Sequence, residues 1–500
     1  MKVSRVLIAA CLVANWSALT RAQEKAPAAP GPEAKPKPAA AAKPQGPFLA
    51  KPYLQLGGSQ APGKLLVLWH ATDSDAPWAV DVRTPADRAW KTVKDPKFSR
   101  VAVAGIEPHR VYRATVKVDE PGGVFTYRVR KGEAVLFEAE AHAPKSADQT
   151  HRFAVFGDCG ADTPEQRLIA YRAFLSRPDF VMITGDIVYG KGLISEYRDK
   201  FWPVYNADDA SPSTGVPLLR STLFLAAPGN HDIASRDLGK TPDGLAYYYY
   251  WYQPHNGPIG KEGGPTVAPL VGPEANRRAF LEAAGNSFPR MANFSFDYGN
   301  AHWTVLDANA TVDWTDRELR DWVARDLEAA KDATWRFVSF HQPGFSSSKK
   351  HFDEQYMRIL APIFEVGKVD LVFSGHVHNY QRTYPLRFAP AAENGASAAL
   401  GADGKPAKVR HVDGKLALDR RFDGRADTTP EGVIYVVSGA GGQNLYNPEQ
   451  QDDPASWQEF TYKHISKVHS LTVVDVDGKI LTVRQVTPGG EEVDRFIVTR

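Results

Sequence analysis

Five short apolar runs constrain the fold of this chain most, because each leads into a block that carries an acidic, amide or imidazole side chain. The runs span residues 152–156, 180–184, 222–226, 335–340 and 369–374. The blocks are Gly157-Asp158-Cys159-Gly160, Gly185-Asp186-Ile187-Val188-Tyr189, Gly229-Asn230-His231-Asp232, Val338-Ser339-Phe340-His341 and Gly375-His376-Val377-His378. Runs of this length, bounded by Gly or Pro and separated by helical patterns, are typical of buried strands in βα units. Residues just beyond the carboxyl ends of such strands can converge on one point.

The side chains in these blocks suit a hard or borderline metal cation. Two ions that share one carboxylate can clamp the attacking and leaving oxygens of a phosphoryl displacement. Each block alone is weak evidence, because Gly-Asp is usually a turn, Gly-Asn-His-Asp can cap a helix, and a lone His is more often a core or surface residue. The imidazoles of His376 and His378 are stronger, since two ligands at i and i+2 can reach adjacent ions. The order of all five blocks predicts one binuclear metal centre.

With these blocks the chain resembles the metallophosphoesterase superfamily, and Tyr189 narrows the resemblance to the purple acid phosphatases. The resemblance implies an α/β catalytic domain, a four-layered αββα sandwich. It implies a first metal, ferric iron in this family, held by Asp158, Asp186, Tyr189 and His378. It also implies a second metal, Fe²⁺, Zn²⁺ or Mn²⁺, held by Asn230, His341 and His376, with Asp186 bridging the two ions.

Two further histidines match catalytic positions of the family. The resemblance implies that His231 hydrogen-bonds the phosphate and that His351 stabilises the transition state or protonates the leaving oxygen. The alternative for His231 is a turn cap, and for His351 a place on the solvent face of a helix patterned over 352–366. Lys350 departs from the plant pattern, which has histidine there. A lysine can attract phosphate but is a poor proton donor.

These residues favour a phosphohydrolase of the acid phosphatase type, which hydrolyses phosphate monoesters by attack of a metal-bound hydroxide on phosphorus. A phosphodiesterase or nucleotide hydrolase with the same centre is one alternative. A cell-surface binding protein with a vestigial metal site is another, and the seven occupied ligand positions argue against it. The expected partner is a small-molecule phosphate ester.

The first 47 residues have the pattern of a secreted protein. Lys2 and Arg5 precede the apolar stretch 6–13, and Thr20-Arg21-Ala22 is a suitable cleavage site, so 1–22 is predicted to be a signal peptide. Its apolar stretch is too short to span a bilayer. Cleavage would change the net charge from +2 to −1, which favours neither nucleic acid nor an anionic membrane. Residues 23–47, with seven prolines, are predicted to be a linker.

The mature protein is expected to have a periplasmic or extracellular location and one cysteine, Cys159, which is predicted to be a buried structural thiol. Residues 48–148 carry short strand patterns that predict an all-β sandwich. This region resembles the fibronectin type III-like domain that precedes the catalytic domain in large purple acid phosphatases. Residues 149–500 are assigned to the catalytic domain.

Four segments of the catalytic domain carry specific expectations. Thr315-Asp316-Arg317-Glu318 is interpreted as a capping box that begins a helix. Asp477-Gly478 predicts a hairpin within 471–486. The insertion 386–430 is either a substrate lid or a surface excursion. The segment 247–252 either lines the mouth of the site or packs over the sheet edge.

Overall fold

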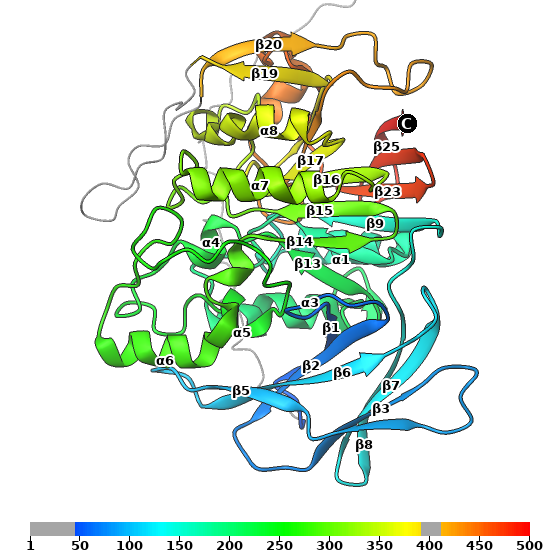
Figure 1. Cartoon of the computed structure of the whole chain (residues 1–500), viewed down its shortest axis with the longest axis vertical. Helices are drawn as coiled ribbons and strands as arrows, with labels where there is room; N and C mark the ends of the chain where they lie inside the picture. The colour runs from blue at the N-terminus through cyan, green and yellow to red at the C-terminus, as the bar shows by residue number, and fades with distance from the viewer. Residues whose placement is uncertain (1–45, 392–411) are drawn as a thin grey trace, which may run out of the picture. The chain divides into compact units, whose positions relative to one another are not determined.

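The computed structural model describes residues 46–391 and 412–500, and these belong to one compact unit (Figure 1). The predicted signal peptide and nearly all of the linker lie outside the described residues. Among those described, there is no helix long and apolar enough to cross a membrane.

The N-terminal region is an all-β sandwich of two antiparallel four-stranded sheets, as the sequence predicts. The first sheet has the order β1 (Ala50–Gln55), β2 (Lys64–Thr72), β6 (His109–Lys117) and β5 (Lys97–Val101). The second has the order β4 (Lys91–Lys94), β3 (Trp78–Arg83), β7 (Val124–Lys131) and β8 (Ala134–His142). Alternate residues of both sheets point inward, so that Trp69, Val80 and Tyr127 are buried between them.

The C-terminal region contains two larger sheets. One has the order β13 (Leu223–Ala226), β10 (Phe180–Ile183), β9 (His151–Phe156), β23 (Leu471–Asp477), β24 (Ile480–Val486) and β25 (Glu492–Thr499). The other has the order β14 (Phe294–Tyr298), β15 (Ala301–Val305), β16 (Trp335–Ser339), β17 (Leu371–Ser374), β21 (Ile434–Ser438), β18 (Tyr380–Thr383) and β22 (Thr461–Ile465). The strands that precede the metal blocks are parallel: β9 and β13 flank β10, and β16 pairs with β17. Their carboxyl ends therefore lie at the same edges.

Helices cover the outer faces of these two sheets, which gives four layers in the order αββα. The helices are α1 (Pro164–Ser176), α2 (Ile194–Glu196), α3 (Trp202–Tyr205), α4 (Asn230–Ile233), α5 (Tyr247–Tyr250), α6 (Glu274–Ala284), α7 (Arg317–Ala329) and α8 (Ala361–Val366). Phe153, Trp303 and Phe373 pack between the sheets. Buried residues of α1 pack on the outer face of the sheet that contains β9 and β10, and those of α7 and α8 on the outer face of the sheet that contains β16 and β17 (Figure 1). Both faces of the parallel strands are thus covered, which explains their continuous apolar runs.

Two helix predictions require correction. The helix α7 begins one residue later than the capping box implied: Asp316 is its N-cap and accepts from Leu319 N, whereas the Thr315 hydroxyl donates to Asp313. The expected helix over 352–366 is wrong. The chain forms two 3₁₀ segments, Phe352–Glu354 and Tyr356–Leu360, before the short α8.

The two alternatives for residues 247–252 are resolved in favour of packing. The four tyrosines of α5 are buried, and the Tyr247 hydroxyl donates to the carbonyls of Ala226 and Met291. Two other small sheets are hairpins, β11 (Asn206–Ser211) with β12 (Gly215–Pro217), and β19 (Leu386–Pro390) with β20 (Gly414–Leu418). The latter lies within the insertion 386–430, and its Phe388 belongs to the same buried hydrophobic cluster as Phe364 of α8. The predicted hairpin over 471–486 is confirmed as β23 and β24.

A buried polar network joins the sandwich to the catalytic region. The Tyr53 hydroxyl lies 2.9 Å from His70 Nε2 and donates to the Tyr250 carbonyl at 2.7 Å. His109 Nε2 lies 3.0 Å from the Tyr250 hydroxyl, and Arg198 lies 3.3 Å from His109 Nδ1. The His70 and Tyr250 rings stack at 4.3 Å. Three strands of the sandwich, β1, β2 and β6, and α5 therefore share one buried polar network.

Candidate metal centre

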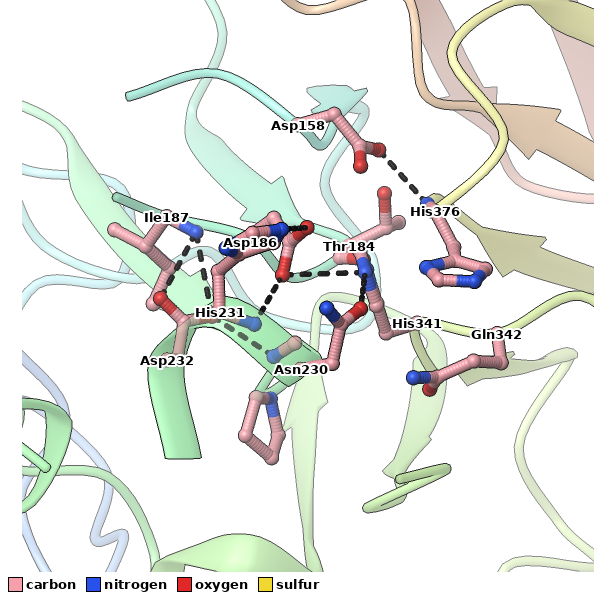
Figure 2. A network of polar contacts seen from close by, with 12 residues as sticks. Asp158, Thr184, Asp186, Ile187, Asn230, His231, Asp232, His341, Gln342 and His376 are labelled. Carbon is pink, nitrogen blue, oxygen red and sulfur yellow. Dashed lines mark hydrogen bonds and ion pairs between the residues drawn. The ribbon is translucent and has the colours of Figure 1, made fainter. Parts of the chain in front are cut away.

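The five predicted blocks converge at the carboxyl ends of the parallel strands. Figure 2 shows Asp158, Asp186, Asn230, His341 and His376 turned toward one another. The backbone ties the first two loops together, because Asp158 N donates to Gly185 O at 3.0 Å and Cys159 N donates to Asp186 O at 3.1 Å. The structure thus brings side chains from five separate loops to one place.

One group of donors consists of Asp158, Tyr189 and His378. The Tyr189 hydroxyl donates to Asp158 Oδ1 at 3.0 Å and lies 2.9 Å from His378 Nε2. His378 Nε2 lies 3.4 Å from the same carboxylate oxygen. All three side chains are buried, and the phenol oxygen, the imidazole nitrogen and one carboxylate oxygen lie within 3.4 Å of one another.

A second group consists of Asp186, Asn230, His341 and His376. His341 Nε2 lies 3.2 Å from Asp186 Oδ1 and 3.2 Å from Asn230 Oδ1. Ligand atoms of Asp186, His341 and His376 lie within 4.8 Å of one another. His376 also links the two groups, because its backbone N–H donates to Asp158 Oδ2 at 2.9 Å. All seven side chains named from the sequence are therefore in one cluster.

The glycines in these blocks permit this close approach. A Cβ on Gly185 would lie 2.5 Å from His341 Nδ1, and one on Gly229 would lie 2.1 Å from Asp186 N. The backbones of Asp158, Asp186 and His376 have φ values of 58°, 49° and 65°, a left-handed conformation that non-glycine residues rarely adopt. Such strained residues cluster at functional sites, where the surrounding structure compensates for their cost of about 1–3 kcal/mol each.

Backbone carbonyls fix the orientation of two of the imidazoles. His341 Nδ1 donates to Thr184 O and His378 Nδ1 donates to Asn444 O, each at 2.7 Å. A neutral imidazole carries one N–H, so each Nε2 presents its lone pair to the cluster. Metal-ligating histidines commonly have this arrangement.

The sequence did not single out Asp232, which holds two of the loops together. Its buried carboxylate accepts from Gly229 N at 2.8 Å and from Ile187 N at 3.1 Å. It therefore ties the Asn230 loop to the Asp186 loop. The block Gly229-Asn230-His231-Asp232 contained this residue, but only the fold shows where its carboxylate points.

The electrostatics of the cluster favour a bound cation. Burial lowers the pKa of His341, but the Asp186 carboxylate outweighs it and raises the pKa to about 9. Burial also raises the pKa of Asp232 to about 8, with a further contribution from Asp186. The Asp186 carboxylate thus stabilises a positive charge placed beside it. The set of carboxylate, phenol, amide and imidazole donors fits the two cations that a binuclear centre requires.

His231 and His351 both lie beside the cluster. His231 Nδ1 is 3.0 Å from Gly190 O, and its Nε2 is 3.9 Å from Asp186 Oδ2. The His351 ring lies 4.1 Å from that of His376. His351 has a φ of 61° and precedes the first 3₁₀ segment, so the alternative of a place on the solvent face of a helix over 352–366 is wrong. The Lys350 Nζ lies 5.8 Å from the Tyr446 ring.

Two other residues near the cluster escaped the sequence interpretation. Glu354 contacts both His351 and His376. The Tyr446 ring stacks on His378 with 3.9 Å between centroids. The sequence gives only a weak indication of Glu354, which is its spacing of three residues from His351. Tyr446 follows the insertion, and no nearby motif indicates it.

Cys159 is a buried, free thiol, as the sequence predicts, and Sγ lies 3.7 Å from Ile187 O. Burial raises the pKa of this thiol far above its ordinary value. It is therefore a small apolar residue of the core beneath the site.

Sequence comparisons agree with this geometry. The model of the calcineurin-like phosphoesterase family matches residues 151–380, which include all seven predicted ligands. An uncharacterized protein of Mycobacterium tuberculosis is 24% identical over 420 residues, which cover 78% of this chain and 69% of that protein. Purple acid phosphatase 23 of Arabidopsis thaliana is 25% identical over 271 residues, which cover 50% of this chain and 51% of that protein.

The fold also matches a solved structure. A purple acid phosphatase from yellow lupin seeds aligns with a TM-score of 0.61 and 16% identity, over 90% of this chain and 74% of that one. The β-sandwich and the four-layered region correspond in both. Membership of the phosphoesterase family implies a two-metal centre at the cluster. Residues 151–380 belong to the calcineurin-like phosphoesterases, and the chain is distantly related to the purple acid phosphatases.

Proposed function

We propose that this protein is a secreted binuclear-metal phosphohydrolase of the acid phosphatase type, which hydrolyses phosphate monoesters. The observation that carries the proposal is the convergence of seven donor side chains from five loops, two of whose imidazoles are aimed by backbone carbonyls. A vestigial site would not need to retain all seven donors, the glycines between them and the buried Asp232.

The ligand assignment follows the two groups of side chains. Asp158, Tyr189 and His378 would hold a first cation, Fe³⁺, and Asp186 would contact both ions. Asn230, His341 and His376 would complete the site of a second cation, Fe²⁺, Zn²⁺ or Mn²⁺. When bound, the two cations supply an activated water and neutralise charge on the phosphoryl oxygens.

The chain's own residues would handle the substrate and the leaving group. His231 Nε2, which is close to Asp186, is suited to donate to a phosphoryl oxygen. The P–O ester bond breaks as the oxygen of water bonds to phosphorus. His351 would transfer a proton to the departing ester oxygen, and Lys350 would attract the anionic substrate.

Secretion is proposed from the sequence of residues 1–22. The presence of a single, buried cysteine after residue 22 is compatible with an oxidising compartment, because no second thiol of the mature chain is available to pair with it.

The test is hydrolysis of a panel of phosphomonoesters and phosphodiesters by the purified full chain. Asp186→Asn should abolish turnover, because the carboxylate shared by both ions is lost. Asp209→Asn, which neutralises an exposed carboxylate on β11, is the matched control and should retain turnover.

Preference for diesters over monoesters would overturn the proposed substrate class in favour of a phosphodiesterase. Full activity of Asp186→Asn would show that the metal cluster is not required for hydrolysis. If the metal-loaded wild-type chain hydrolysed neither class, the proposal of a phosphohydrolase would be wrong.

A further inference from the structure

One carboxylate lies between a predicted metal ligand and a predicted proton donor. Glu354 ends the 3₁₀ segment that follows His351. Its Oε1 lies 2.8 Å from His351 Nδ1, and its Oε2 lies 2.7 Å from His376 Nε2. An ionised carboxylate only accepts hydrogen bonds, so each imidazole donates its N–H to a separate oxygen of the same side chain.

These two hydrogen bonds determine which nitrogens remain for other partners. A neutral His376 that carries its proton on Nε2 has its lone pair on Nδ1, and that nitrogen is the one able to bind a cation. In His351 the Nδ1 side is turned to Glu354, so Nε2 is the nitrogen left for a substrate. Carboxylates that hold ligating histidines in this way raise metal affinity and fix the ring direction.

His376 differs from the other two predicted histidine ligands in its anchor. His341 and His378 donate to main-chain carbonyls, whose positions are set by the loops themselves. His376 donates to a side chain, and that side chain also holds His351. The left-handed backbone of His351 lies outside any regular helix, so its ring direction depends on contacts such as this one.

We propose that Glu354 is a positioning residue that holds His376 toward the second cation and His351 toward the leaving group at the same time. This inference rests on the proposed function, because the second role requires a phosphoester substrate. Glutamine has the same shape, but its amide offers one accepting oxygen and one donating nitrogen. It can accept from only one of the two imidazoles.

The experiment compares Glu354→Gln and His351→Ala with the wild-type chain. Asp353→Asn, in the same 3₁₀ segment, is the control for loss of a nearby charge. The first readout uses no substrate: affinity for Zn²⁺ at the second site is measured by competition with a chromophoric chelator. Glu354→Gln should bind about 10–100-fold more weakly, whereas His351→Ala and Asp353→Asn should match the wild type.

The second readout is leaving-group dependence in the metal-saturated proteins. The ratio of kcat/KM for 4-nitrophenyl phosphate to that for an alkyl phosphate should rise at least about tenfold in both Glu354→Gln and His351→Ala. This result is expected because an activated aryl leaving group needs no proton. In Asp353→Asn the ratio should stay at the wild-type value.

A change in only one readout for Glu354→Gln would overturn the shared role, and so would a change in neither. A third ion in the wild-type chain that is absent from Glu354→Gln would also overturn it, because Glu354 and the two imidazoles would then be ligands. If the wild-type chain hydrolysed no phosphoester, the proposed function would fail. The role of Glu354 at His376 is tested separately, because unchanged Zn²⁺ affinity of Glu354→Gln would reject that role whether or not the chain hydrolyses phosphoesters. Glu354→Asp, which keeps the charge on a shorter side chain, replaces Glu354→Gln if that variant does not fold, and the same two readouts apply.

Discussion

Acidification should weaken the attachment of the sandwich to the catalytic region through His109. The ring is fully buried, with Nε2 3.0 Å from the Tyr250 hydroxyl and Arg198 3.3 Å from Nδ1. Burial, followed by the charge of Arg198, lowers the pKa of His109 to about 4. Burial and the nearby His109 and Arg198 lower the pKa of His70 as well. Burial and the nearby positive groups therefore oppose protonation, and at His109 they outweigh the opposite effects of the Glu107 carbonyl and Asp73.

The sign and size of the effect follow from linkage. The folded-state pKa of His109 lies below that of the unfolded chain, about 6.5, so the unfolded chain binds protons first as the pH falls. The stabilisation is present above about pH 6.5 and is lost progressively toward pH 4. Between pH 7 and pH 5 this one histidine should reduce the free energy of unfolding by about 2 kcal/mol. His70 should act in the same direction.

The assay is urea unfolding at pH 7 and pH 5, with tryptophan fluorescence as the signal that monitors unfolding. His109→Gln can still hydrogen-bond to Tyr250 but cannot be protonated, so its loss of stability between the two pH values should be about 2 kcal/mol smaller than in the wild type. His142→Gln, which alters an exposed histidine on β8, should keep the wild-type dependence. The same pH dependence in His109→Gln and the wild type would show that protonation of His109 does not cause the loss of stability.

Three further predictions concern the metal cluster. Tyr189→Phe should bleach a pink or purple protein, because phenolate bound to ferric iron absorbs visible light; a colourless, iron-free and active wild type would reject the ferric assignment. Metal analysis should find both ions depleted in Asp186→Asn but mainly the second ion in Asn230→Ala, and two ions per chain in both would contradict the ligand map. His351→Ala should slow alkyl phosphates more than aryl phosphates, within the range of about 10²–10⁴-fold typical of general acid catalysis; equal penalties in kcat/KM would exclude proton donation.

Strands could be predicted from the sequence where a continuous apolar run reflects burial on both faces of a sheet. The strands β9, β10 and β16 match the predicted runs to within one residue, because parallel strands covered by helices leave few polar positions. The edge strands β4 and β8 were missed. The β4 sequence Lys91–Lys94 is mostly exposed and carries no apolar run. The β8 sequence has only one buried residue, although residues 134–137 are apolar, so its apolar residues do not report burial on both faces.

The prediction of a helix over 352–366 was wrong because a helical spacing of apolar residues does not determine the backbone conformation. The left-handed His351 and the 3₁₀ turns after it place Glu354 beneath two imidazoles, a tertiary arrangement that overrides local preference. Pro362 also occupies the first turn of α8, a position that favours a new helix start over continuation.

The cluster itself was predictable from block order, because its donors follow the strands directly. The supporting contacts were not. Asp232, Glu354 and Tyr446 act through side-chain directions that depend on how separate loops meet. The network joins Tyr250 to His70 and His109, which lie more than one hundred residues earlier in the chain, and no local sequence pattern indicates it.

Whether the cluster is a catalytic two-metal centre is tested by measuring metal stoichiometry and phosphomonoester hydrolysis together during chelation and reconstitution of the full chain. We expect two ions per chain in the active protein, loss of hydrolysis as the ions are removed, and recovery when both are restored. Undiminished hydrolysis by a protein stripped of both ions would contradict this expectation.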